Sequence, residues 1–286
     1  MQVPIFDTHQ HLWDLRELRL PWVDSNPPLN RNFLLADYAA ATAGYNIAKT
    51  LYMEVDVDPA DLDKEAVSVL ALCNSPSNPM GGAIIGCRPA DPDFPTYTEK
   101  WSQFPEIRGM RQVLHAGAPT GFCTTPDFVN GVQLLGQLGL TFDICIKPSE
   151  LAYAAALADL CPHTQFILDH CGNADITWQD TSKERAIWLS GIEDIAKRSN
   201  VACKISGIVV TAKDAAWKSV DLSPYVEKCV EAFGIDRVLF GGDWPVCTLQ
   251  ASLSRWIDAL AEITSGWTIE DQHRIWHENG ERIYGV

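Results

Sequence analysis

The chain lacks the marks of three large classes of protein. It has no run of about 18 apolar residues, which a bilayer-spanning helix needs, so no membrane segment is expected. It has no basic stripe, and its 22 Lys and Arg against 37 Asp and Glu give a formal net charge of −15. This charge disfavours nucleic acid and anionic membranes as partners. Its nine cysteines include no Cys-x-x-Cys pair, so buried thiols are expected rather than a disulfide framework.

The rest of the composition is that of a globular protein. The 286 residues are 47% hydrophobic and 21% charged, close to the average of folded domains. No linker, repeat or low-complexity tract divides the chain, so residues 1–286 are expected to form one domain. Asp7, His9 and His11 interrupt the opening apolar run, unlike a secretory signal, and this predicts a cytoplasmic location. No motif specifies an oligomeric state.

Short apolar runs alternate with helical patterns along the chain. The runs are rich in Val, Ile, Leu and Phe, and several lack polar alternation, as strands buried on both faces of a parallel sheet do. Eight strands are predicted: Val3–His9, Thr50–Val55, Gly82–Cys87, Ile107–Val113, Thr141–Lys147, Gln165–His170, Val201–Ser206 and Arg237–Asp243. Six helices are predicted between them: Ala60–Cys73, Pro126–Leu138, Ser149–Leu160, Trp188–Lys197, Pro224–Phe233 and Leu249–Ile263. This alternation favours a (β/α)8 TIM-like barrel over a doubly wound open sheet, whose glycine-rich first turn is absent.

Two proline-containing segments break the alternation. Residues 14–35 are irregular, and we interpret them as a loop over a site or as surface padding. The gap between the third and fourth strands is also irregular, and no helix is predicted there. It contains Pro89, Pro92, Pro95 and Pro105.

The first and eighth strands end in residues that carry chemistry. Asp7, His9 and His11 alternate, so they are expected to share one face of the strand. In a barrel this end faces the mouth of the active site. Two imidazoles there can ligate a divalent metal or polarise a carbonyl, or they can form a buried hydrogen-bonded pair. Asp243 closes the eighth strand, beside the first. It can act as a general base on water, as a metal ligand, or as a cap of a helix or loop.

Basic or ionisable side chains occur in other strands, where they are costly unless they are paired or lie at a wet mouth. They are Arg111 in the fourth strand, Lys147 at the end of the fifth, His170 at the end of the sixth and Lys204 in the seventh. Together they indicate an anionic or oxyanion-forming substrate. Singly, each could form an ion pair with Glu54, Asp143 or Asp169. Asp169 alternates with His170, so it is expected to point away from the site.

Four further residues have weaker signals. Glu54, at the end of the second strand, is a candidate for the site. Trp13 and Trp244 each follow a site motif, and their indoles could stack on a sugar or ring substrate or pack in the core. Cys145 shares the parity of Lys147, and we interpret it as a packing residue because no nucleophile–base pair surrounds it in the sequence.

Taken in order, these motifs resemble the amidohydrolase superfamily. The closest likeness is to the amidohydrolase-2 group, which holds sugar-lactone hydrolases of the L-fuconolactonase and L-rhamnonolactonase type and hydrolases of pyrone-dicarboxylate and sulfomuconolactone. The likeness covers nearly the whole chain. It is carried by Asp7–Trp13 (DTHQHLW), Gly109–Leu114 (GMRQVL), Leu168–Gly172 (LDHCG), Cys203–Gly207 (CKISG), Phe240–Val246 (FGGDWPV) and Glu278–Tyr284 (ENGERIY).

The resemblance implies a distorted barrel and a hydrolase that acts on the carboxylic ester bond of a small-molecule lactone. It matches His9 and His11 to the first-strand histidines of the group, His170 to the sixth-strand histidine and Asp243 to the eighth-strand aspartate. The group's metal-dependent decarboxylases carry His-Pro at the end of the fifth strand, whereas this chain has Lys147-Pro148. A protonated lysine is no ligand and repels a cation.

Two expectations follow for the cofactor and the reaction. The leading expectation is that no metal is required, although His9, His11 and Asp243 could hold a zinc-like divalent ion. Asp243 is expected to deprotonate water, while His9, His11 and His170, helped by Lys147, polarise the lactone carbonyl. Arg111 and Lys204 are expected to hold hydroxyls or a carboxylate of the substrate. The alternative activity is metal-dependent, non-oxidative decarboxylation of an aromatic or unsaturated acid.

Overall fold

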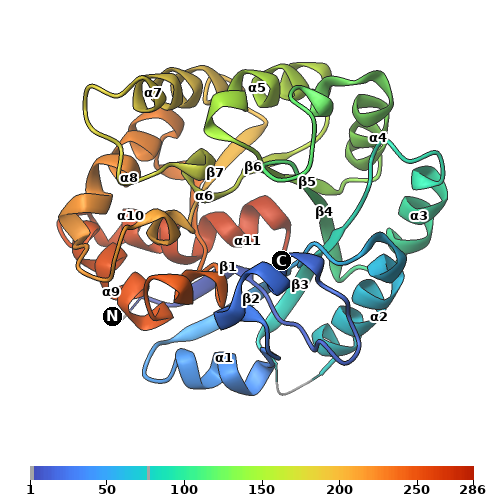
Figure 1. The fold of residues 1–286 in the computed structure, drawn as a ribbon, viewed down its shortest axis with the longest axis horizontal. Coiled ribbons are helices and arrows are strands. Elements are labelled where there is room, and N and C mark those ends of the chain that lie inside the picture. The colour runs from blue at the N-terminus through green and yellow to red at the C-terminus, as the bar shows by residue number, and fades with distance from the viewer. Residues whose placement is uncertain (1–2, 76–77) are drawn as a thin grey trace.

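The computed structural model describes residues 3–75 and 78–286. Eight parallel strands follow one another in the order β1 to β8, and a ring of helices surrounds them (Figure 1). The strands are β1 (Ile5–Gln10), β2 (Ile47–Met53), β3 (Met80–Gly86), β4 (Ile107–Val113), β5 (Thr141–Cys145), β6 (Phe166–Leu168), β7 (Val201–Ile205) and β8 (Val238–Phe240). A bridge between Gln10 and Trp244 joins the chain beyond β8 to β1. The predicted TIM-like barrel is therefore confirmed.

Helices follow each of the strands in sequence or precede the next one, and they lie outside the strands in space (Figure 1). They are α1 (Leu35–Ala41), α2 (Leu62–Cys73), α3 (Phe94–Trp101), α4 (Pro126–Gln137), α5 (Leu151–Leu160), α7 (Lys183–Ile195), α8 (Ser219–Phe233) and α9 (Leu253–Ile263). The chain ends with α10 (Ile269–His273), a π-helical turn (Arg274–Glu278) and α11 (Asn279–Tyr284). The segment labelled α6 (His170–Asn173) has positive φ angles and is a left-handed turn.

All eight predicted strands and all six predicted helices are present, most of them with at least one end shifted. The fourth strand matches the prediction at both ends. The interpretation of the gap between β3 and β4 as wholly irregular is wrong, because α3 lies in it. Pro95 does not prevent this helix, since it stands in the first turn, where the backbone N–H has no partner within the helix. Shifts of register between β1 and β2, β2 and β3, and β3 and β4 distort the barrel.

The core has two parts. The larger lies between the strands and the surrounding helices. The smaller consists of strand residues that face one another inside the barrel, such as Phe6 and Ile167, and it includes Tyr284 of α11. Helix α11 thus brings a side chain into the barrel interior, and the polar residues at the strand ends lie above this packed layer.

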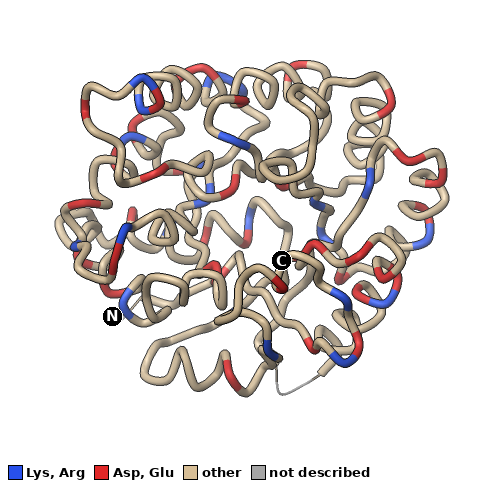
Figure 2. Tube along the Cα trace, in the orientation of Figure 1, with Lys and Arg blue, Asp and Glu red and all other residues tan. Residues whose placement is uncertain are grey.

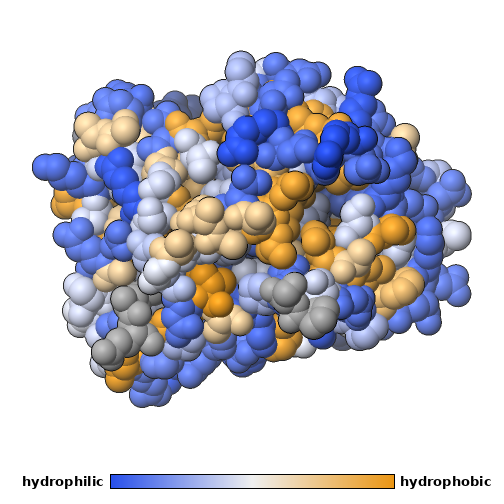
Figure 3. Space-filling view, turned by 90° about the horizontal axis from the view of Figure 1, so that it is seen from below, coloured by the Kyte–Doolittle hydropathy of each residue, from blue (hydrophilic) through white to orange (hydrophobic). Residues whose placement is uncertain are grey.

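Charged residues lie mostly on the outer helices and loops, where Lys and Arg are interspersed among the more numerous Asp and Glu (Figure 2). On the face drawn in Figure 3, apolar side chains gather near the middle and are bordered by hydrophilic ones. Within the two described ranges, no helix is both long and apolar enough to cross a membrane.

Candidate active site

A cavity of about 390 Å³ opens at the carboxyl ends of the strands. His11, Arg111, His170 and Asp243 line it, together with Cys145 and other residues from the strand ends. Trp22, Ser25 and Asn26 also line it, and they belong to the irregular segment 14–35. Part of that segment therefore lies over the cavity, which favours the interpretation as a loop over a site.

His11 and Asp243 meet at the floor of this cavity, as predicted. His11 Nε2 lies 3.4 Å from Asp243 Oδ1, and His9 Nε2 lies 3.7 Å from the same oxygen. The Nδ1 of His11 is 3.0 Å from the carbonyl oxygen of Met53. A carbonyl only accepts, so Nδ1 of His11 donates to it, and this bond turns Nε2 toward Asp243.

The chain around Asp243 is held in an uncommon conformation. Asp243 has a φ of 53°, and its N–H donates to the carbonyl of His9 at 2.9 Å. Gly242 donates its N–H to Asp7 at 2.7 Å, and a Cβ at Gly242 would lie 2.4 Å from an Asp7 oxygen. Only glycine allows this approach, which ties the end of β8 to β1.

The prediction that Asp7 shares a face with His9 is wrong. Asp7 accepts a hydrogen bond from Tyr38 of α1 at 2.7 Å, whereas His9 faces the charged groups inside the barrel. The cause is the irregular register between Asp7 and Gln10, which breaks the alternation of side chains. Burial, the largest influence, raises the pKa of Asp7. Asp7 anchors the strand end and does not line the cavity.

His9 is fully buried beneath the cavity floor. Its Nδ1 lies 3.2 Å from Lys204 Nζ and 3.4 Å from an Asp169 oxygen, and its Nε2 lies 3.3 Å from Arg111 Nη1. Burial holds the pKa of His9 well below its ordinary value. The ring is therefore neutral, and it acts on the cavity through its contacts with Asp243 and His11.

His170 reaches the site from the left-handed turn after β6. Its φ is 55°, its ring centroid lies 4.6 Å from that of His9, and its Nδ1 lies 2.9 Å from the hydroxyl of Ser206. Burial lowers the pKa of His170, but Asp243 and Cys145 outweigh this and the net direction is upward. Gly207 makes room for the ring, because a Cβ there would lie 2.3 Å from His170 Nδ1.

The prediction that Asp169 points away from the site is wrong. Its carboxylate lies inside the barrel, 3.0 Å from Arg111 Nη1 and 3.1 Å from Lys204 Nζ. Side-chain alternation fails here because β6 ends at Leu168, before Asp169. Burial alone would raise the pKa of Asp169, but Lys204 outweighs it and the pKa falls well below its ordinary value.

Arg111 lines the cavity but is held by acidic partners. Its Nε donates to Glu54 at 2.6 Å, and its Nη2 donates to the Glu54 carbonyl at 2.9 Å. Glu54 is fully buried under Arg111 and also accepts from the N–H of Asp56. Glu54 is thus a supporting residue, and the ion-pair interpretation holds for both it and Arg111.

Lys204 does not reach the cavity, contrary to its expected contact with substrate. It is 0% exposed, and its Nζ lies 2.7 Å from Asp143 and 3.1 Å from Asp169. Tyr284 of α11 donates to the same Asp143 oxygen at 2.6 Å. Its position on β7 places Lys204 inside the barrel but too deep to touch a ligand, so it neutralises carboxylates.

Lys147 also lies outside the cavity. Strand β5 ends at Cys145, two residues earlier, and the Lys147 side chain is 43% exposed and 3.6 Å from Glu150. Trp13 and Trp244 are buried and pack against Phe33, away from the cavity lining. The indole that lines the cavity is that of Trp22.

Among the cavity residues that sequence reasoning missed, three contact one another: Cys145, His115 and Asn173. Cys145, interpreted as packing, lines the cavity with its sulfur 3.2 Å from His115 Nδ1 and 3.8 Å from Asn173 Nδ2. Burial, followed by Arg111, lowers the pKa of His115. His115 comes two residues after the end of β4, so the signal used for the other strand ends was present. Asn173 follows β6 through the left-handed turn and had no such signal.

The residues His9, His11 and Asp243 suit a divalent ion. One ligand atom from each lies within 4.8 Å of the others. Two ligands about 2.0–2.1 Å from a tetrahedral zinc ion stand about 3.4 Å apart, which the His11–Asp243 distance of 3.4 Å matches. The bond of His11 to the Met53 carbonyl orients its ring as outer partners of metal ligands do.

The expectation that no metal is required therefore finds no support. It depended on repulsion by Lys147, whose ammonium group pairs with Glu150 outside the cavity. The cation that adjoins the donor set is Arg111, at 3.3 Å from His9 Nε2, and two carboxylates already balance it.

Comparison with known proteins identifies the family of the chain. An uncharacterized protein of Sinorhizobium fredii is 29% identical over 304 residues, 99% of each chain. An L-fucono-1,5-lactonase of Burkholderia multivorans is 26% identical over 300 residues, 98% of this chain and 95% of its own. An amidohydrolase from Burkholderia multivorans, solved with bound zinc, has a TM-score of 0.87 at 22% identity over 99% of each chain. The amidohydrolase family model matches residues 6–286, and the chain therefore belongs to the amidohydrolase family.

Proposed function

We propose that this protein hydrolyses the ring ester of a lactone, and that its substrate is a hydroxylated sugar lactone. The observation that carries the proposal is the Asp243 carboxylate beside His11 and above His9, on the floor of a cavity that His170 also lines. A carboxylate base and imidazole donors around one cavity are the groups that ester hydrolysis needs. The relatedness to an L-fucono-1,5-lactonase supports this choice.

The proposed reaction begins with water beside Asp243. Asp243 accepts a proton from the water as its oxygen attacks the ring carbonyl, and the carbonyl oxygen becomes an oxyanion. We assign Nδ1 of His170 as the acceptor of the Ser206 hydroxyl, so that its Nε2–H donates a hydrogen bond to this oxyanion and keeps its proton. When the ring C–O bond breaks, Asp243 returns its proton to the leaving oxygen. The net change is one water added across the ester.

His9 and Arg111 support these groups from below. A neutral His9 ring lies against Asp243 without holding it in an ion pair. Arg111 has five N–H donors, and four are engaged by Glu54, Asp169 and His9. The fifth is left for a hydroxyl or carboxylate of the substrate. A zinc-like ion bound by His9, His11 and Asp243 would supply Lewis acidity at the carbonyl.

A substrate panel tests the proposal. Proton release is followed in a pH-stat with sugar lactones, with unsubstituted butyrolactone and valerolactone, and with a dicarboxylated pyrone. We expect the sugar lactones to have the highest kcat/KM, because the cavity offers Arg111, Asn26 and Ser25 to hydroxyl groups. A preference for the unsubstituted lactones contradicts the sugar-lactone assignment. A preference for the pyrone moves the substrate to the carboxylated lactones.

The decarboxylase alternative is tested on the same preparation. Aromatic and unsaturated acids are offered with added zinc or manganese, and released CO₂ is measured. We expect none above background. CO₂ release with no lactone turnover would replace the proposed function by the alternative.

A further inference from the structure

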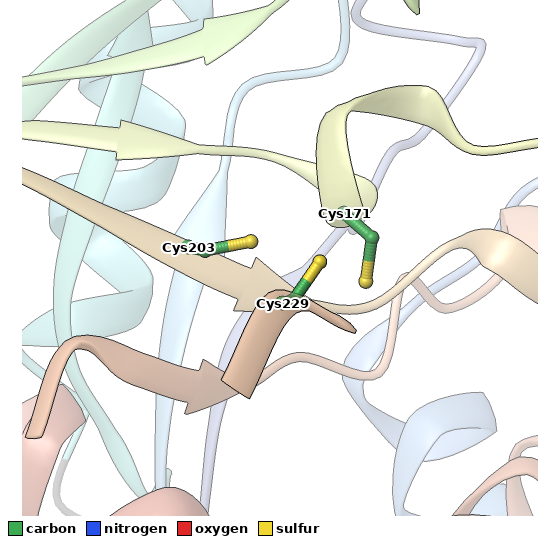
Figure 4. Close-up of side chains that lie close together, drawn as sticks. All are labelled: Cys171, Cys203 and Cys229. Atoms are coloured by element: carbon green, nitrogen blue, oxygen red, sulfur yellow. The ribbon is translucent and has the colours of Figure 1, made fainter. Parts of the chain in front are cut away.

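Three cysteines that are distant in sequence bring their sulfur atoms together outside the cavity. Cys171 lies on the turn after β6, Cys203 on β7 and Cys229 on α8, and their side chains converge (Figure 4). One sulfur from each lies within 4.8 Å of the other two. All three residues are 0% exposed. The cluster shares no residue with the group of His9, His11 and Asp243.

The backbone is held in an uncommon conformation to place Cys171 in this cluster. Cys171 has a φ of 52°, a left-handed angle that is costly for a residue with a Cβ. Trp188 stabilises the turn by donating its indole N–H to the Cys171 carbonyl at 2.7 Å. Strain held in this way is often related to function. The same turn sends His170 into the catalytic cavity and Cys171 toward the two other sulfur atoms.

The three thiols differ in their readiness to ionise. Hydrogen bonds from Cys203 and Cys229 hold the pKa of Cys171 well below its ordinary value. Burial raises the pKa of Cys203, and the hydrogen bond with Cys171 raises the pKa of Cys229. Of the three thiols, Cys171 is therefore the one whose ionisation its neighbours favour, and its S–H donates to the Lys204 carbonyl at 3.9 Å. Thiolate sulfur is the form that ligates soft metals.

The spacing and number of the sulfur atoms select the class of ion. Three sulfur atoms that bind one ion through metal–sulfur bonds of about 2.3 Å lie about 3.7–4.0 Å apart. The three sulfur atoms here lie within 4.8 Å of one another, so small movements would bring them to that spacing. In the described part of the chain, this group contains no His, Asp or Glu. Structural zinc sites take four protein ligands, whereas monovalent copper is stable with three thiolates. We propose that Cys171, Cys203 and Cys229 form a buried three-sulfur site for a soft cation of the Cu(I) class.

Binding requires no change of oxidation state. Three metal–sulfur bonds form as the three S–H bonds break, and the thiol protons pass to the buffer. Because no atom of these residues reaches solvent, the ion enters during folding or by local opening of the turn. The site does not depend on the proposed lactone hydrolysis, and its test uses no substrate.

The test loads the full-length protein with Cu(I). Cells are grown in copper-supplemented medium, and purified protein is also equilibrated with one equivalent of Cu(I) under a phosphine reductant. Bicinchoninate then removes loosely held copper. We expect one copper per chain, with near-ultraviolet sulfur-to-copper absorption and a luminescence typical of shielded Cu(I)–thiolate. The variants Cys171→Ser, Cys203→Ser and Cys229→Ser should each retain at least about tenfold less copper.

Matched controls separate this site from other thiols. Cys161 is 1% exposed and lies outside the cluster, so Cys161→Ser should retain copper as the wild type does. Cys145→Ser should also retain it, although Cys145 lies beside His115 in the cavity. Copper that is lost with Cys145→Ser, or kept by Cys203→Ser, overturns the proposal.

X-ray absorption of the copper-loaded wild type gives a result that does not depend on folding of the variants. We expect a first shell of three sulfur atoms. A shell containing nitrogen, or no retained copper in the wild type, shows that the three thiols are only packed together. When Zn²⁺ is offered in the same way, the amount of zinc that the protein retains should be the same in Cys203→Ser as in the wild type. Zinc lost in that variant contradicts the assignment to a monovalent ion.

Discussion

Gly207→Ala tests whether the position of His170 controls catalysis. A Cβ at Gly207 would lie 2.3 Å from His170 Nδ1 and 2.6 Å from its Cγ, so the ring must move. Its hydrogen bond to Ser206, at 2.9 Å, is then lost. A left-handed φ of 67° costs alanine about 1–2 kcal/mol, and the lost hydrogen bond adds about 1 kcal/mol. Displacement of a catalytic group by about 1 Å reduces kcat by about 10²-fold.

Gly139→Ala is the matched control for this variant. Gly139 has a φ of 71°, and nothing lies within 4 Å of a Cβ placed there. Alanine at Gly139 therefore has the same unfavourable backbone conformation as alanine at Gly207, but without the steric clash. Urea unfolding and lactone hydrolysis are measured for both variants at a temperature where both are folded. We expect similar losses of stability to within about 1 kcal/mol and a loss of kcat in Gly207→Ala alone. Wild-type kcat in folded Gly207→Ala refutes the role of His170.

Three further predictions concern the buried charges and the metal. Burial raises the pKa of Glu65 from 4.5 to about 7, so the folded chain keeps a proton that the unfolded chain releases. The free energy of unfolding therefore falls as pH rises from about 5 to 7, by about 1.4 kcal/mol for each pH unit between the two pKa values. Urea unfolding of Glu65→Gln, measured over the same pH range, should not show this fall. Lys204→Met leaves Asp143 without its cation and should destabilise the fold by about 3–5 kcal/mol, part of which Asp143→Asn restores in the double variant. Zinc affinity, measured by competition with a chelator, should fall at least about 10²-fold in His11→Ala and stay unchanged in Lys147→Ala; equal affinities in the two variants contradict the assigned ligands.

The barrel and the centre of the site were predictable because both depend on short-range patterns and on one rule of topology. Apolar runs identify the strands, and parallel strands of a barrel end at the same mouth. His9, His11 and Asp243 follow from that rule even though more than 200 residues of sequence separate Asp243 from the histidines, since the first and last strands of a closed barrel are neighbours.

The wrong predictions of side-chain position concern residues just beyond the end of a strand, and one residue whose depth in the barrel could not be predicted. Side-chain alternation was extended past Leu168 to Asp169, and past Cys145 to Lys147, although the backbone leaves the strand at those points. Lys204 faces inward as expected of a basic strand residue, but its depth depends on the register of β7 against its neighbours. A single sequence does not specify that register.

Contacts between distant segments left no local signal. Trp13 and Trp244 stand next to site motifs in sequence, yet packing against Phe33 turns both away from the cavity. The three-sulfur cluster joins a turn, a strand and a helix, so no spacing motif marks it. Such contacts emerge only when the barrel brings these elements side by side.

The most direct test of the account is the kcat of Asp243→Asn with a sugar lactone in the pH-stat. Asparagine keeps the size and hydrogen-bonding reach of Asp243 but cannot accept the proton of water, so we predict that kcat falls by about 10²–10⁴-fold with the fold intact. Asp56→Asn changes another carboxylate that lines the cavity, one paired with Arg88 at 3.3 Å, and should keep kcat within a few-fold. A kcat for Asp243→Asn within a few-fold of the wild type would contradict the central claim that Asp243 is the general base.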